Sequence, residues 1–220
     1  MIPIPAPRSS AFDAVLCDLD GVIRFFDHTE LAELEKAAGL SRGSTALVAF
    51  GPDTAQPLIL GQLTRQQWED SIAAGLAGRV RTDEARALAA AFTGSPVRAD
   101  REVVDLLRRT RQHCPVLLVT NATPWLAEDL ARLGLADLAA GAVNSALVGA
   151  AKPDHRIYRV AADRAGVVPE RCLFVDDRPE NVRAAEQLGM TGVHFRSPAD
   201  LRAALSPVLG VSPSDAGPRS

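Results

Sequence analysis

Residues 15–23 read VLCDLDGVI, and this stretch decides the fold. The apolar run of residues 12–17 is typical of a strand covered on both faces in a parallel α/β sheet, where ligands collect at the carboxyl ends of strands. The run stops at Asp18 and Asp20, and Gly21 then permits a turn. Two carboxylates so close repel each other unless a cation or a proton lies between them. The stretch alone also fits a strand end with turn-forming residues, so the rest of the chain must separate the two interpretations.

The composition is that of an ordinary globular protein. The 220 residues suffice for one large domain or a domain with a modest insertion, and 47% of them are hydrophobic. The net charge of -3 provides no basic field, so we expect neither a nucleic-acid partner nor a membrane partner. The 3 cysteines show no paired spacing, and no apolar stretch has the length of a membrane span or a signal peptide. We therefore expect a cytoplasmic protein without disulfide bonds.

A segment with helical spacing follows the first strand. Apolar residues recur at helical intervals over residues 31–38, 63–77 and 83–92, and no clear strand separates them. Thr64 with Gln67 predicts a capping box for the second helix, and Thr82 is the expected N-cap of the third. Asp27 on one side and the Gly-Ser-Pro sequence of residues 94–96 on the other mark the edges of this insertion.

These patterns divide the chain into three parts. We expect an α/β core domain of residues 1–26 and 95–205 and a small all-helical domain of residues 27–94. The tail of residues 206–220 is rich in Ser, Pro and Gly, which predicts disorder.

From residue 100 onward, strand and helix patterns alternate. Strands are expected at residues 116–119, 142–144, 172–175 and 192–195, and helices at residues 101–112, 123–132, 157–165, 179–188 and 197–205. Thr123 and Pro124 have the chemistry of an N-cap and a first helical residue. The alternation predicts a doubly wound parallel sheet of the α/β class. Because parallel strands end at one edge, we expect the following side chains to converge there: Asp18, Asp20, Thr120, Lys152 and Asp176.

Lys152 stands out because lysine is rare in this chain. Lys36 and Lys152 are its only lysines, against 24 lysines and arginines together. A compact ammonium group can contact a carboxylate and a phosphoryl oxygen at once, which a planar guanidinium does with different geometry. Taken alone, Lys152 also fits a solvated loop charge.

Four short motifs in order give the chain a family resemblance. Asp-Leu-Asp-Gly-Val from residue 18, Thr-Asn from residue 120, Lys-Pro from residue 152 and Asp-Asp-Arg-Pro-Glu-Asn from residue 176 together resemble the haloacid dehalogenase (HAD) superfamily of hydrolases, with its Rossmann-like core. The insertion between the first two motifs resembles the helical cap of one of its subfamilies. Within that subfamily the chain looks most similar to glucose-1-phosphate phosphatases and to the amino-terminal domains of epoxide hydrolases.

The resemblance implies a magnesium-dependent phosphatase that forms an aspartyl-phosphate intermediate. Asp18 would be the nucleophile and Asp20 the general acid and base. Mg²⁺ would be held by Asp18, the backbone carbonyl of Asp20 and Asp176. The remaining roles would be phosphoryl binding by Thr120, the amide of Asn121 and Lys152, and support of the metal loop by Asp177 and Asn181. The partner would be a small phosphorylated metabolite such as a sugar phosphate.

Other functions remain open at this point. A phosphosugar mutase would share the first step. A haloacid dehalogenase needs neither an acid at Asp20 nor magnesium, and a phosphoacceptor module of the receiver type lacks the Asp-x-Asp pattern and an insertion of this length. The leaving group depends on side chains of residues 27–94. Among residues near the expected cleft, we interpret His28 as an exposed loop histidine, Trp125 as a packing residue, and Arg24 with Phe25 as either structural or part of the entrance.

Overall fold

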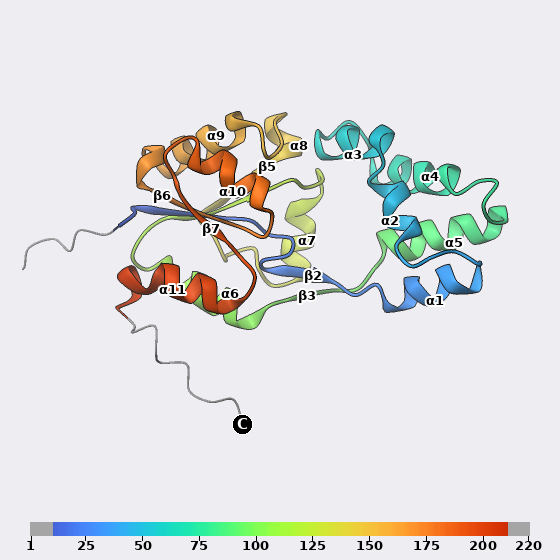
Figure 1. Cartoon of the computed structure of the whole chain (residues 1–220), viewed down its shortest axis with the longest axis horizontal. Coiled ribbons are helices and arrows are strands. Elements are labelled where there is room, and N and C mark those ends of the chain that lie inside the picture. Colours follow the sequence, from blue (N-terminus) through green and yellow to red (C-terminus); the bar gives the residue numbers. More distant parts are fainter. Residues whose placement is uncertain (1–10, 211–220) are drawn as a thin grey trace, which may run out of the picture.

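The computed structural model describes residues 11–210, and its core is a five-stranded parallel sheet. The strand order is β5 (Gly141–Asn144), β4 (Val116–Thr120), β1 (Ala14–Cys17), β6 (Cys172–Asp176) and β7 (Thr191–His194). The first strand therefore lies at the centre of the sheet (Figure 1). This arrangement confirms the predicted doubly wound parallel sheet.

Helices cover both faces of the sheet, as the alternation of side chains along β1 requires. Val15 and Cys17 pack into the cluster formed with α6 (Arg101–Thr110), α7 (Leu126–Arg132) and α11 (Pro198–Leu209). Ala14 and Leu16 pack into the opposite cluster, formed with α9 (His155–Ala165) and α10 (Pro179–Glu186), with α8 (Ser145–Val148) at its margin. A short 3₁₀ helix, η1 (Pro169–Arg171), leads into β6. All residues of β1 are fully buried, as predicted for a strand covered on both faces.

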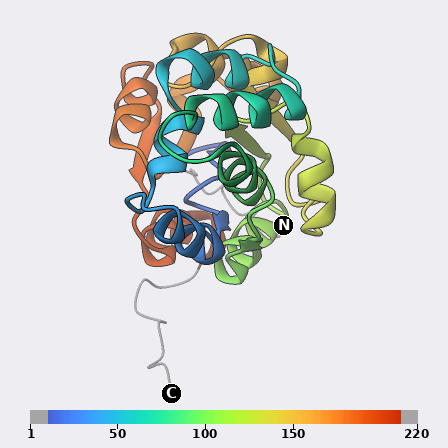
Figure 2. The same cartoon turned by 90° about the vertical axis from the view of Figure 1, so that its right-hand side faces the viewer.

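The insertion is helical and has its own apolar cluster. It contains α1 (Thr29–Ala37), α2 (Ser44–Ala49), α3 (Pro52–Ile59), α4 (Arg65–Gly75) and α5 (Thr82–Thr93). The sequence predicted α1, α4 and α5 but missed α2 and α3, which are short and include a proline, Pro57, inside α3. Figure 1 shows these helices beyond the carboxyl ends of the strands, and Figure 2 views the molecule from their side.

A short ribbon connects the insertion to the core. Strands β2 (Arg24–Phe26) and β3 (Val97–Ala99) pair antiparallel, with Phe26 opposite Val97. The backbone N–H of Asp27 donates to the carbonyl of Pro96 at 2.8 Å, which extends the pairing by one bond. The sequence did not predict this ribbon, because strands of three residues are too short to show an alternating pattern.

The predicted start of α4 is confirmed, whereas those of α5 and α7 are wrong. The capping box of Thr64 and Gln67 at α4 is confirmed by both of its hydrogen bonds. The N-cap predicted at Thr82 is wrong: α5 already begins at Thr82, and the Glu84 side chain accepts from the N–H of Arg81. The start predicted at Thr123 and Pro124 is also wrong, since these residues lie in the loop and turn before α7.

The end of α11 corrects the predicted tail. Helix α11 continues to Leu209, so residues 206–209 are ordered and not part of a disordered tail. Pro207 cannot donate to the carbonyl of Ala203, but the hydroxyl of Ser206 donates to that carbonyl at 2.8 Å instead. Val208 and Leu209 also pack against the core, which favours the helix. The rest of the predicted tail, residues 211–220, and the first ten residues of the predicted core lie outside the described residues.

The structure agrees with the absence of disulfide bonds, because Cys17, Cys114 and Cys172 are all free thiols. Over residues 11–210, no helix combines the length and the apolar character needed to cross a bilayer.

Candidate active site

Two adjacent strands deliver carboxylates to one edge of the sheet. Cys17 of β1 pairs with Val175 of β6, so Asp18 and Asp176 follow at the same level. The backbone N–H of Asp18 donates to the carbonyl of Val175 at 2.9 Å, which extends the ladder by one bond. Thr120 ends β4 on the other side of β1 and is 1% exposed. The register of the sheet thus brings three predicted site residues to one edge.

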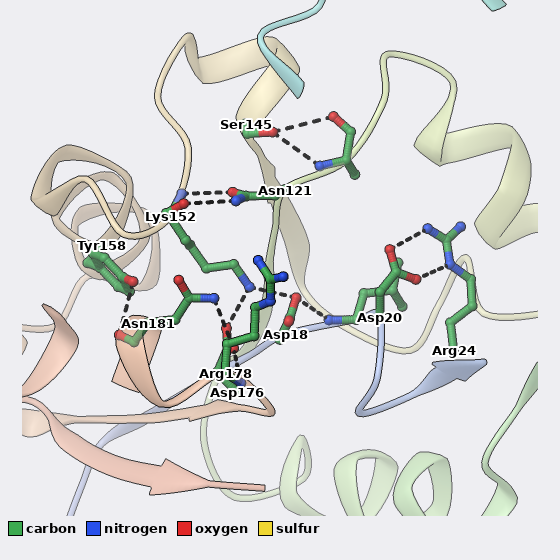
Figure 3. A network of polar contacts seen from close by, with 12 residues as sticks. Asp18, Asp20, Arg24, Asn121, Ser145, Lys152, Tyr158, Asp176, Arg178 and Asn181 are labelled. Carbon is green, nitrogen blue, oxygen red and sulfur yellow. Dashed lines mark hydrogen bonds and ion pairs between the residues drawn. The ribbon is translucent and has the colours of Figure 1, made fainter. Parts of the chain in front are cut away.

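Lys152 bridges the two buried carboxylates (Figure 3). Its Nζ lies 2.6 Å from Oδ1 of Asp18 and 2.7 Å from Oδ2 of Asp176, and its side chain is 2% exposed. The structure therefore excludes the interpretation of Lys152 as a solvated loop charge. One ammonium group cannot neutralise two carboxylates, so the three side chains together carry a net negative charge when all are ionised.

The charges of this cluster shift one another's pKa values. Burial raises the pKa of Asp18 to about 7, and the charge of Asp176 adds to the rise while Lys152 opposes it. Burial alone would lower the pKa of Lys152, but the two carboxylates more than offset burial and its pKa is raised. Lys152 is therefore held as a cation between its partners.

The second carboxylate is held by neighbours on the loop after β6. Oδ1 of Asp176 accepts from the backbone N–H of Arg178 at 2.9 Å and from Nδ2 of Asn181 at 3.0 Å. The hydroxyl of Tyr158 in turn donates to the backbone carbonyl of Asn181 at 3.0 Å. Asn181 thus orients Asp176, consistent with its expected supporting role.

Asn121 supports the lysine loop with its side chain. Its Oδ1 accepts from the backbone N–H of Lys152 at 2.7 Å, and its Nδ2 donates to the carbonyl of Lys152 at 2.9 Å. The family resemblance implied that the amide of Asn121 donates to the phosphoryl group. That donor role stays a prediction. The side-chain contacts show that Asn121 also positions the backbone of Lys152.

Asp177 comes closer to the site than expected. Ligand atoms of Asp18, Asp176 and Asp177 all lie within 4.8 Å of one another. Gly21 makes this approach possible, because its φ is +84° and a Cβ there would lie 2.4 Å from Oδ2 of Asp177. Burial, followed by the charge of Asp176, raises the pKa of Asp177. A divalent cation that prefers oxygen ligands would relieve the repulsion among these three carboxylates.

Asp20 does not face this cluster through its carboxylate. Its Oδ1 lies 2.6 Å from Nε of Arg24, and its Oδ2 accepts from Nη2 of Arg24 at 2.9 Å, so the contact is bidentate (Figure 3). Arg24 is 6% exposed and also lies 3.5 Å from Oδ2 of Asp129 on α7. The predicted convergence of the Asp20 side chain with Asp18 is therefore not seen, because Arg24 holds it. Sequence reasoning considered Arg24 but assigned it no partner.

A cavity of about 450 Å³ lies between the insertion and this edge. Asp20 and Asn121 belong to its wall on the core side. His28 lies in the loop before α1, as expected, but it is half-buried in the wall, where it stacks with Phe26 and Phe92, so the expected exposure is wrong. Trp125 also lines the cavity, below the guanidinium of Arg65.

The insertion contacts the core at two points near this cavity. The hydroxyl of Ser145 donates to the carbonyl of Ile59 at 2.6 Å and accepts from the backbone N–H of Ala122 at 3.1 Å. The guanidinium of Arg65 lies 4.9 Å from the ring centre of Trp125. Ser145 was missed because it directly follows a weakly patterned strand and has no motif of its own.

Comparison with known proteins supports a single family. A family model for haloacid dehalogenase-like hydrolases matches residues 12–189. A flavin mononucleotide hydrolase of Arabidopsis thaliana is 36% identical over 97 residues, which are 43% of this chain and 38% of the relative. A phosphatase of Mycobacterium tuberculosis is 29% identical over 193 residues, which are 82% of this chain and 85% of the relative. The chain thus spans well under two thirds of the length of the plant relative.

Solved structures show the same fold. A HAD family enzyme from Bacteroides thetaiotaomicron, solved in complex with magnesium and inorganic phosphate, superposes with a TM-score of 0.64 at 22% sequence identity. The match covers 82% of this chain and 92% of that chain.

Proposed function

The chain belongs to the haloacid dehalogenase-like hydrolases, and we propose that it is a magnesium-dependent phosphatase of small phosphorylated metabolites. The observation that carries this proposal is the buried cluster of Asp18, Lys152 and Asp176, with Asp20 two residues after the first of these carboxylates. The match to the family model confirms the family resemblance of the motifs. The names of the relatives, a phosphatase and a flavin mononucleotide hydrolase, support the reaction class.

The donor set of the site fits magnesium. Asp18, Asp176 and Asp177 offer hard oxygen ligands within 4.8 Å of one another, and Mg²⁺ is usually bound by a few carboxylates and waters. We propose that Asp18 and Asp176 bind the ion together with the backbone carbonyl of Asp20, and that Asp177 supports or joins them. When bound, magnesium supplies positive charge that allows a carboxylate to approach a phosphate and that offsets the charge on the phosphoryl oxygens.

The first half of the reaction uses both aspartates of the opening motif. A carboxylate oxygen of Asp18 bonds to phosphorus while the bond between phosphorus and the leaving oxygen breaks. Asp20 gives its proton to that leaving oxygen, so the product leaves as a neutral alcohol. Thr120, the amide of Asn121 and Lys152 stabilise the charge on the phosphoryl oxygens.

The second half returns the enzyme to its starting state. Water attacks the phosphorus of the aspartyl phosphate, and Asp20 accepts a proton from that water. The bond between phosphorus and Asp18 breaks, which releases inorganic phosphate and restores the free carboxylate.

The contact between Asp20 and Arg24 adds a conformational requirement to this scheme. Both carboxylate oxygens of Asp20 contact Arg24, whereas the first proton transfer needs one of them to face the leaving oxygen. Asp20 must therefore leave Arg24 before it acts as an acid. We propose that the helical insertion serves as a cap whose movement accompanies this exchange, since Arg24 lies in the ribbon that connects the insertion to the core.

The cellular compartment and the subfamily are two further parts of the proposal. The three free cysteines suit a reducing compartment, so we place the protein in the cytoplasm. The resemblance to glucose-1-phosphate phosphatases and to the amino-terminal domains of epoxide hydrolases stays a prediction.

The proposal is tested by phosphate release with and without Mg²⁺. Asp18→Asn should abolish release from every accepted ester, and a chelator should abolish release by the unchanged protein. Release that survives Asp18→Asn would contradict the proposed nucleophile, and dehalogenation that survives the chelator would support a dehalogenase. Interconversion of hexose phosphates without net release would indicate a mutase, and an aspartyl phosphate that persists without turnover would indicate a phosphoacceptor.

A further inference from the structure

The cavity next to Asp20 is built largely from aromatic rings. The chain has only 7 phenylalanines, 2 tryptophans and 1 tyrosine. Both tryptophans and three of the phenylalanines line this one cavity, together with the imidazole ring of His28. A chain so poor in aromatic residues thus gathers half of them at the place where a leaving group would lie.

These rings form a continuous wall. Phe26, His28 and Phe92 stack nearly parallel, with centre distances of 5.9 and 5.5 Å. Trp68 packs edge to face on Phe92 at 5.8 Å and lies 6.4 Å from Trp125 on the core side. The wall therefore crosses from the insertion to the core.

Several side chains of the wall are exposed to solvent. Phe26 is 45% exposed and Phe50 is 56% exposed, although Phe50 contacts both Phe92 and Trp68 at ring distances. Val97 of the ribbon, also lining the cavity, is 37% exposed. Exposed apolar side chains that gather around one cavity are typical of a binding site, whereas rings that serve only as a core are covered.

Most charged groups of the wall contact one another. The carboxylate of Asp129 lies 3.5 to 3.6 Å from the guanidinium groups of Arg24, Arg65 and Arg132, and Nη2 of Arg65 is buried without a hydrogen-bond partner among residues 11–210. Nδ1 of His28 lies 2.9 Å from the hydroxyl of Ser95. A sugar needs a polar partner for each of its hydroxyl groups, and most polar groups of this wall already contact one another, whereas a flat apolar ring needs no such partner.

We propose that the preferred substrates are phosphate monoesters whose leaving group carries an aromatic ring system, which stacks against Phe26, Phe50 and Trp68. This inference rests on the proposed phosphatase function and narrows its substrate class from small phosphorylated metabolites in general to esters with an aromatic leaving group. Asp20 lies in the same wall, so the leaving oxygen would sit between the ring and the proton donor. The cavity of about 450 Å³ has the size of ordinary small-molecule sites.

The test compares esters of similar leaving-group acidity. Naphthylethyl phosphate, ethyl phosphate and glycerol phosphate are all esters of primary alcohols, so the ring is the main difference. We expect kcat/KM for naphthylethyl phosphate to exceed that for the other two by at least about tenfold. Phe50→Ala should lower the ratio of naphthylethyl to ethyl phosphate by about three- to tenfold. Leu47→Ala, a change to a 78% exposed side chain on α2 outside the cavity wall, should leave the ratio unchanged.

The outcomes separate this inference from the function on which it rests. Hydrolysis of all three esters at similar rates, or a ratio that Phe50→Ala does not change, would overturn the inference and leave the phosphatase proposal standing. If no ester is hydrolysed, the phosphatase proposal fails. Calorimetry with naphthylethanol then decides whether the cavity binds an aromatic ring. Binding that Phe50→Ala weakens would support an aromatic ligand, and no binding would overturn the inference.

Discussion

Replacing Lys152 with methionine tests the charge balance at the sheet edge. The change keeps most of the apolar stem of a side chain that is 2% exposed and removes the ammonium group between Asp18 and Asp176. Two buried carboxylates then face each other without a counter-charge. Lys36→Met is the matched control, because Lys36 is the chain's other lysine and is exposed on α1.

The expected cost is large because both partners are buried. Removing one member of a buried ion pair typically destabilises a protein by about 3–5 kcal/mol, since the remaining charge keeps its desolvation cost. For a chain of this length, that corresponds to a decrease in Tm of roughly 6–20 °C. A divalent cation can replace part of the missing charge, because Asp177 adds a third carboxylate within reach.

The assay is thermal unfolding of both variants, with and without Mg²⁺, followed by phosphate release. Lys152→Met should have a much lower Tm in the presence of a chelator, and Mg²⁺ should raise its Tm by more than it raises that of Lys36→Met. Phosphate release should fall by about 10²- to 10³-fold, since a donor to the phosphoryl oxygens is lost.

Two results would refute this reasoning. If Lys152→Met unfolds at the same temperature as Lys36→Met, the ammonium group does not compensate the two carboxylates. If Mg²⁺ raises the Tm of both variants equally, the cation does not bind among the carboxylates that Lys152 bridges.

Three further changes test the loops around the site. Gly21→Ala should destabilise the protein by about 1–3 kcal/mol, because φ is +84° at this position. It should also raise the Mg²⁺ concentration needed for activity, because the new methyl group displaces Asp177. An unchanged Mg²⁺ titration would count against this role of Gly21. Asn121→Ala should lower the free energy of unfolding, measured in urea, by about 1–3 kcal/mol and should lower kcat, because two hydrogen bonds to the backbone of Lys152 are lost. Full activity would show that the loop around Lys152 holds its position without these bonds. Backbone hydrogen bonding, first from the N–H of Arg196, lowers the pKa of Asp200, so its stabilisation is present above the unfolded pKa of about 3.9 and is lost as the pH falls through the lower folded value. Asp200→Asn should therefore lose about 0.5–1 kcal/mol at neutral pH and nothing in strong acid, and a difference that persists in acid would contradict this cause.

The sheet was predictable because its strands carry a strong local signal. Each central strand is an apolar run that ends in polar residues, and parallel pairing then places those ends together. The position of Asp18 beside Asp176 follows from this rule, whereas Lys152 lies beyond α8 and reaches both carboxylates through a loop. The ribbon of β2 and β3 has no such signal, because its six residues include both exposed and buried side chains in no regular order.

The side-chain orientations at the site were less predictable. Asp20 and Arg24 are four residues apart in a loop and a short strand, and only the turn at Gly21 brings their side chains together. The positioning role of Asn121 was not predicted, because nothing in the sequence shows that its side chain meets the backbone of a residue 31 positions away. Strand ends fix which residues meet, while loop geometry fixes which atoms do.

The ribbon of β2 and β3 also makes the insertion a separable module. Its two connections to the core run antiparallel and are hydrogen-bonded to each other, so the chain enters and leaves the insertion at one point. Everything between Asp27 and Pro96 could be replaced by a tight hairpin turn without moving either end. We therefore expect the same sheet edge to accept a larger, smaller or absent insertion, so that the residues proposed to contact the leaving group can be exchanged while those proposed to act on phosphorus stay in place.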